Sequence, residues 1–142
     1  MQLTVERLGK VSFTVQARSH LVLSDQPKDN GGTDKAMTPP ELFLASLGTC
    51  VGYYVVQFCD ARRLDTGEMR IQVDGEILPH PGRIGKIAVR IRLPFELEAG
   101  KLKALIRAAT HCTIHNTLMH PPEIRVEVVQ EALAVPTQDT ER

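Results

Sequence analysis

Two cysteines far apart in the sequence are the residues best suited to chemistry. Cys50 ends the stretch TPPELFLASLGTC (residues 38–50), and Cys112 lies 62 positions later in the stretch HCTIHNTL (residues 111–118). A cysteine thiolate is both a nucleophile and a metal ligand. The sequence therefore allows three roles for these thiols, as core residues, as metal ligands or as partners in a redox reaction.

The third cysteine, Cys59, cannot pair with Cys50 inside one regular helix. The two residues are nine positions apart, and at about 100° per residue they lie on opposite faces of a helix. Free cysteine is among the residue types most often buried. We therefore predict that Cys59 is a core residue.

Metal binding is one interpretation of the segment around Cys112. His111, His115 and His120 surround this cysteine in the sequence, and thiolate and imidazole groups suit zinc. However, the segment has no C-x-x-C or H-E-x-x-H spacing, and His120 precedes two prolines. We expect no bound metal. The other interpretation, that Cys112 meets Cys50 in space, cannot be decided from spacing.

A long helix is predicted to carry Cys50. Thr38, two prolines and Glu41 form a capping-box pattern that starts a helix, and the helix should run to about residue 62 or 63. Near Cys50 the helix has small side chains, which would let another group approach closely. These small residues are Ser46, Gly48, Thr49 and Gly52.

The predicted helix is apolar almost all round, so it must be covered on all sides. One sheet of a chain this small covers only part of it, which suggests a second subunit packed on the same helix. Residues 42–59 carry no charge, a length at the lower limit for a membrane span. Polar residues within this stretch favour a buried helix and no membrane contact.

The remaining patterns predict one α+β domain over residues 1–142. Strands are expected at residues 3–8, 11–17 and 20–24, followed by a polar loop at 25–37. Two long antiparallel strands should follow from residue 68, then an amphipathic helix over 102–109 and a short helix over 113–119. Alternating Ile124, Val126 and Val128 predict a last strand, and the tail from about residue 132 should be frayed.

Composition excludes several functional classes. The 142-residue chain has 17 basic and 17 acidic residues and a net charge of +0, without a basic run that would favour nucleic acid or an anionic membrane. The first ten residues lack an apolar signal segment. Three cysteines, an odd number, argue against a disulfide framework. We expect a cytoplasmic protein with free thiols.

The two cysteine segments together resemble the paired signature of the OsmC/Ohr family of thiol-dependent hydroperoxide reductases. In this family a Pro-Glu-Leu helix start leads to a cysteine among small residues, as in TPPELFLASLGTC, and a second cysteine follows in a segment similar to CTIHNTL. The order of elements is also similar over about residues 1–130. The resemblance implies antiparallel sheets packed on a long central helix, in an intertwined homodimer with two active sites at the subunit interface.

The resemblance also implies a mechanism without a bound cofactor or metal. Cys50 would attack an organic hydroperoxide or hydrogen peroxide, Cys112 would resolve the sulfenic acid as a disulfide, and an external dithiol would reduce that disulfide. The family activates its thiolate with an N-terminal arginine and a glutamate near the helix start. Arg18 and Glu41 are the matching residues, with Arg7 as a competing arginine.

Two positions depart from the family pattern, and they keep a second function open. Thr113 stands where the family usually has proline, and His115 stands where it usually has serine. The alternative is a non-catalytic or redox-responsive binding protein whose dimeric cleft holds a small apolar or thiol ligand.

Overall fold

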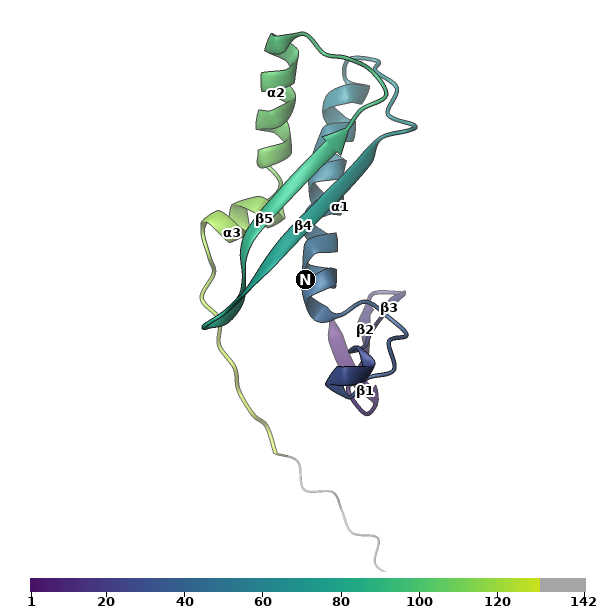
Figure 1. Ribbon diagram of the computed structural model, residues 1–142, viewed down its shortest axis with the longest axis vertical. Coiled ribbons are helices and arrows are strands. Elements are labelled where there is room, and N and C mark those ends of the chain that lie inside the picture. The colour runs from purple at the N-terminus through teal and green to yellow at the C-terminus, as the bar shows by residue number, and fades with distance from the viewer. Residues whose placement is uncertain (131–142) are drawn as a thin grey trace, which may run out of the picture.

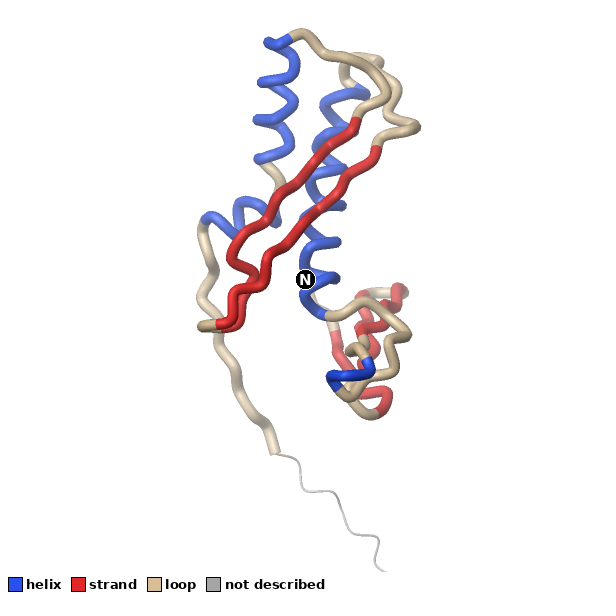
Figure 2. The backbone as a smooth tube through the Cα atoms, in the orientation of Figure 1, coloured by secondary structure: helices blue, strands red, loops and turns tan. Residues whose placement is uncertain are grey.

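The computed structural model describes residues 1–130, which form two antiparallel sheets and three α-helices (Figures 1 and 2). This confirms the α+β class. The predicted frayed tail from about residue 132 lies outside the described residues. The elements in chain order are β1 (Thr4–Gly9), β2 (Ser12–Ala17), β3 (His20–Ser24), the 3-10 helix η1 (Lys28–Asn30), α1 (Pro39–Asp60), β4 (Arg70–Pro79), β5 (Gly82–Arg92), α2 (Ala99–Thr110) and α3 (Thr113–Met119).

The start of α1 is the predicted capping box. Glu41 Oε2 accepts hydrogen bonds from the backbone N–H of Thr38 (2.7 Å) and from its hydroxyl (2.8 Å). Because these bonds favour the charged carboxylate, they lower the pKa of Glu41. The helix ends at Asp60, close to the predicted boundary, and Arg62 donates to the carbonyl of Phe58 (2.9 Å) in its last turn.

The small residues of α1 let strand β4 lie against the helix. A Cβ atom on Gly48 would lie 2.9 Å from Val73 Cγ2, and one on Gly52 would lie 3.1 Å from Ile71 Cδ1. At both positions a Cβ atom would press on the end of a strand side chain, which would have to shift. The close approach predicted from these small residues is therefore made by β4.

The core lies where α2 and α3 meet α1 (Figure 1). Cys59 is fully buried in this core, which confirms its predicted place. α1 is nevertheless incompletely covered: it is long and apolar enough to cross a membrane by length and composition, and only 28 % of its most apolar window is buried. The buried hydrophobic residues are Leu47, Val51, Val55, Phe58, Cys59, Leu105, Ala109 and Cys112.

The sheet of β1, β2 and β3 stands beside the N-terminal end of α1, away from the β4–β5 hairpin (Figure 1). Two bonds to the carbonyl of Met37 tie it to the segment before α1, from Ser24 Oγ (3.2 Å) and from the Asp25 N–H (3.3 Å). Many of its apolar side chains are exposed, so among residues 1–130 nothing apolar covers this sheet. They are Val5, Leu8, Phe13, Leu21, Val22 and Leu23.

The prediction of a last strand at residues 124–128 is wrong for the single chain. Residues 121–130 have no regular secondary structure, and Ile124, Val126 and Val128 are 81 %, 87 % and 84 % exposed. The alternating pattern is present, but a strand also needs a neighbouring strand to accept its backbone hydrogen bonds. No described strand of this chain pairs with the segment.

Asp25 holds the long loop before α1 to the N-terminal sheet. Its side chain, in a residue only 2 % exposed, accepts bonds from the Ser12 hydroxyl (2.7 Å), the Thr33 hydroxyl (2.6 Å) and the N–H groups of Thr33 (3.0 Å) and Lys35 (3.2 Å). The bonds from Thr33 and Ser12 lower the pKa of Asp25 well below its usual range. The charged carboxylate therefore organises this loop.

We predict that Asp25→Asn lowers the melting temperature at neutral pH, because a neutral amide is a weaker acceptor for four donors. A carboxyl whose pKa is lowered by folding stabilises the fold above its unfolded pKa, about 3.9, and loses this effect as the pH falls further. Thermal unfolding at several pH values should thus show a difference between the two proteins that shrinks below about pH 4.

The matched control is Asp29→Asn, in the exposed part of the same loop, which should melt like the wild type. An Asp25→Asn protein as stable as the wild type at neutral pH would show that the carboxylate does not hold the loop.

Candidate thiol site

Cys50 and Cys112 are neighbours in the folded chain. Cys50 lies in the middle of α1, is partly buried, and packs against the core that contains Cys112. The Cys50 thiol is close enough to Cys112 to raise its pKa. The fold therefore brings together two thiols that are 62 positions apart in the sequence.

Cys112 sits at the N-cap of α3 and is fully buried. Its sulfur accepts a hydrogen bond from the backbone N–H of His115 (3.2 Å), a contact that places the thiol at the first turn of the helix. Cysteine is not among the residues preferred at an N-cap, which are Ser, Thr, Asp, Asn and Gly. Nothing in the sequence around Cys112 predicts this role.

The environment separates the two thiols chemically. Burial is the main cause that raises the pKa of Cys112, the His115 N–H opposes it, and the neighbouring Cys50 adds to the rise. Cys112 therefore stays a protonated thiol at neutral pH, while Cys50 is only partly buried and is the more accessible of the two. This arrangement suits attack by Cys50 followed by reaction with Cys112.

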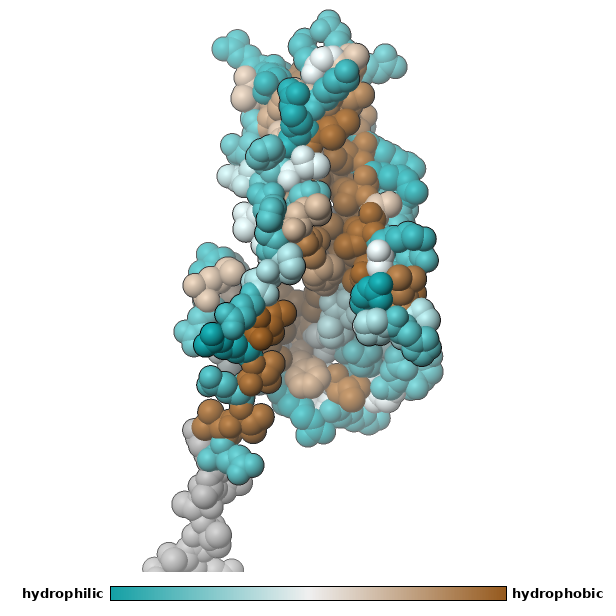
Figure 3. All heavy atoms as spheres, turned by 90° about the vertical axis from the view of Figure 1, so that its left-hand side faces the viewer, coloured by the Kyte–Doolittle hydropathy of each residue, from teal (hydrophilic) through white to brown (hydrophobic). Residues whose placement is uncertain are grey.

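An apolar cavity of about 610 Å³ lies between α1, β5, α2 and α3; its lining includes neighbours of both cysteines in the sequence, but neither cysteine itself. Two of its α1 residues, Leu47 and Val51, flank Cys50 in the sequence, and His115 adds a polar side chain. Figure 3 views the molecule from the side of α2 and α3 and shows hydrophobic side chains gathered along this face. The other lining residues include Ile87, Val89, Ile91, Ile106, Leu118 and Met119.

The other predicted site residues lie away from the thiol pair. Glu41 is engaged with Thr38 at the start of α1. Arg18 is exposed in the turn between β2 and β3, with a φ of 56°, and Arg7 donates to the carbonyl of Lys10 (2.9 Å). Among the described residues, α1 makes its main contacts with β4, α2 and α3, and none of these elements carries Arg18. Catalytic roles for Arg18 and Glu41 stay predictions.

Two histidines near Cys112 form hydrogen bonds to backbone carbonyls at the C-terminal ends of helices. Nδ1 of His111 donates to the carbonyl of Arg107 (2.7 Å), and Nδ1 of His120 donates to the carbonyl of Asn116 (3.3 Å). Within residues 1–130, no group of three or more His, Cys, Asp or Glu side chains is arranged to hold a metal ion.

Comparison with known proteins identifies the family. The sequence model of OsmC-like proteins matches residues 32–127, which is more than half of the chain. This chain belongs to the OsmC-like family, and the match includes both Cys50 and Cys112. No curated protein gives a significant match.

Solved structures share the fold at low sequence identity. A Psychrobacter arcticus protein described as an osmotic stress induced and detoxification response protein is 19 % identical, with a TM-score of 0.76 over 82 % of this chain and 87 % of its own. The Legionella pneumophila organic hydroperoxide resistance protein OsmC is 15 % identical, with a TM-score of 0.60 over 83 % and 89 %. A Vibrio cholerae organic hydroperoxide resistance protein, with captopril in one of its active sites, is 17 % identical, with a TM-score of 0.56 over 83 % and 84 %.

We predict that iodoacetamide alkylates Cys50 first. Cys112 and Cys59 are fully buried, so the reagent reaches them poorly, and burial raises the pKa of both thiols, which lowers their thiolate fraction. In reduced protein at pH 7.5, Cys50 should react at least about ten times faster than either of them.

Peptide mapping by mass spectrometry after short labelling times measures the three rates separately. Equal labelling of Cys50 and Cys112 would contradict the difference between the two environments.

Proposed function

We propose that this protein is a thiol-dependent peroxidase that reduces organic hydroperoxides or hydrogen peroxide. The observation that carries the proposal is the proximity of Cys50 and Cys112, an accessible thiol beside a buried one. Membership of the OsmC-like family and the fold shared with hydroperoxide resistance proteins support a peroxide-related redox role.

The proposed cycle has three steps. The Cys50 thiolate attacks the terminal peroxide oxygen, the O–O bond breaks, and the leaving alkoxide takes a proton to become the alcohol, or water if hydrogen peroxide reacts. The resulting sulfenic acid condenses with the Cys112 thiol, which forms the disulfide and releases water. An external dithiol then reduces the disulfide by exchange and is itself oxidised to a disulfide.

The apolar cavity supports a preference for organic substrates. Leu47 and Val51 belong both to the cavity wall and to the helical turns around Cys50. An alkyl group bound there would lose its contact with water, whereas hydrogen peroxide has no such group to bury. The same cavity favours the alternative function, a protein that binds a small apolar or thiol ligand without turnover.

We predict that Cys50→Ser abolishes consumption of cumene hydroperoxide, because the nucleophile is lost. Cys112→Ser should still reduce one equivalent of peroxide but should stop at a sulfenic acid, which dimedone traps. Cys59→Ser, the matched control, should turn over like the wild type with dithiothreitol as reductant. Peroxide assays and mass spectrometry give these readouts.

Two results would contradict the peroxidase. One is that Cys50→Ser consumes peroxide at the wild-type rate. The other is that the wild type binds cumene hydroperoxide without oxidation of any thiol, as the binding protein would. Equal turnover of hydrogen peroxide and cumene hydroperoxide would contradict only the substrate preference.

We also propose that the protein is an intertwined homodimer that works in the cytoplasm, where a reducing dithiol is available. The support is apolar surface that one chain leaves uncovered, on α1, on the N-terminal sheet and on residues 124–129. A second copy would cover α1 and give the alternating segment a strand to pair with.

We predict a solution mass of about 31 kDa, twice the 15.7 kDa of one chain, by size-exclusion chromatography with light scattering. Tyr53→Glu should shift the protein toward the monomer, because Tyr53 is 60 % exposed on α1 in one chain and a buried carboxylate would be costly. Lys103→Glu, on the exposed side of α2, is the control and should remain dimeric. A monomeric wild type would overturn the dimer.

A further inference from the structure

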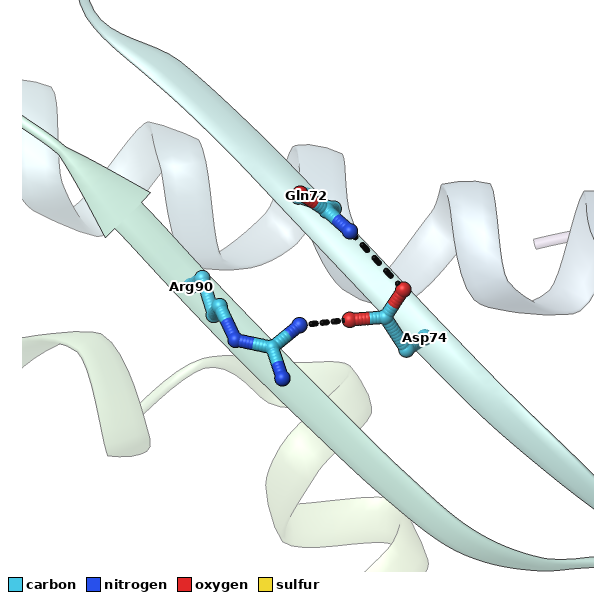
Figure 4. A network of polar contacts seen from close by, with 3 residues as sticks. All are labelled: Gln72, Asp74 and Arg90. Atoms are coloured by element: carbon cyan, nitrogen blue, oxygen red, sulfur yellow. Dashed lines mark hydrogen bonds and ion pairs between the residues drawn. The ribbon is translucent and has the colours of Figure 1, made fainter.

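The outer face of the β4–β5 hairpin carries a row of charged cross-strand pairs. Lys86 binds Glu76 (3.0 Å) where the two residues face each other in the register. Further along, Asp74 accepts from Arg90 and from the Gln72 side-chain amide (Figure 4). Over this part of the face, each acid is matched by a base on the opposite strand.

The last pair of the row breaks this pattern. Arg70 and Arg92 face each other directly in the register, and like charges in directly opposite positions destabilise a sheet. Neither guanidinium has an acidic partner or a side-chain hydrogen bond among residues 1–130. Each guanidinium carries five N–H donors, so a group with several acceptor oxygens would both satisfy them and cancel the repulsion.

The two arginines line one pocket. Its volume is about 290 Å³, and it is formed by Arg70, Ile71, Gln72 and Arg92. The side chains of β4 alternate between the two faces of the hairpin, and Ile71 packs toward Gly52 of α1. Arg70 and Gln72 therefore point to the outer face, as does Arg92, which faces Arg70 in the register. Asp74, on the same face of β4, is paired with Arg90, and neither Arg70 nor Arg92 forms an ion pair among residues 1–130.

We propose that Arg70 and Arg92 form a binding site for a phosphate group. A phosphate carries about two negative charges near neutral pH and three or more acceptor oxygens, which match two guanidinium groups in both charge and geometry. The site lies on the face of the hairpin opposite α1, so it is separate from the thiols and does not depend on the proposed peroxidase activity.

The test is calorimetric titration of the full-length protein with inorganic phosphate and with phenyl phosphate at pH 7.5, in chloride of matched ionic strength. Wild type should bind at least one of the two saturably at one site per chain. Arg70→Gln and Arg92→Gln should each weaken binding by about tenfold or more, the loss expected for a charge-assisted hydrogen bond. Arg83→Gln, on the same hairpin outside the pocket, should bind like the wild type.

A charge reversal separates binding from folding. Arg92→Glu should abolish phosphate binding and yet melt at or above the wild-type temperature in chloride, because it replaces a like-charge pair with an opposite-charge pair. The proposal is overturned if neither phosphate compound binds wild type beyond the chloride control, or if binding survives in Arg70→Gln and Arg92→Gln unchanged. These variants should also reduce peroxide at the wild-type rate. The peroxidase assay therefore tests the proposed function separately from phosphate binding, and either one can fail without the other.

Discussion

The packing of other elements against α1 is the constraint on which the rest of the structure depends. β4 can lie close to this helix because Gly48 and Gly52 leave space for Val73 and Ile71. α2 and α3 pack against other parts of its surface. Cys50 is on the same turns of α1, so the packing that builds the core also sets the position of the thiol pair.

Apolar packing and one hydrogen bond therefore hold the two thiols of the site in place. Burial keeps Cys112 protonated, and the N–H of His115 holds its sulfur at the start of α3. Since α3 has only seven residues, its own hydrogen bonds stabilise it little, and its contacts with α1 are the main reason that Cys112 stays beside Cys50.

Much of this could be predicted from the sequence because the signals are local. The capping box of Thr38 and Glu41 marked the start of α1, and period-two alternation marked β4 and β5. The position of Cys112 beside Cys50 could not be derived from spacing, since it depends on how α3 packs. Residues 124–128 show the opposite case: alternation predicted a strand, but a strand needs a neighbour to pair with, and the described part of the chain provides none.

The count of free thiols after oxidation tests the central claim most directly. Reduced protein contains three thiols per chain; treatment with one equivalent of cumene hydroperoxide should leave one, on Cys59, with a Cys50–Cys112 disulfide inside a single chain in the peptide map. Retention of all three thiols, or a disulfide that joins Cys50 residues of two chains, would contradict the account.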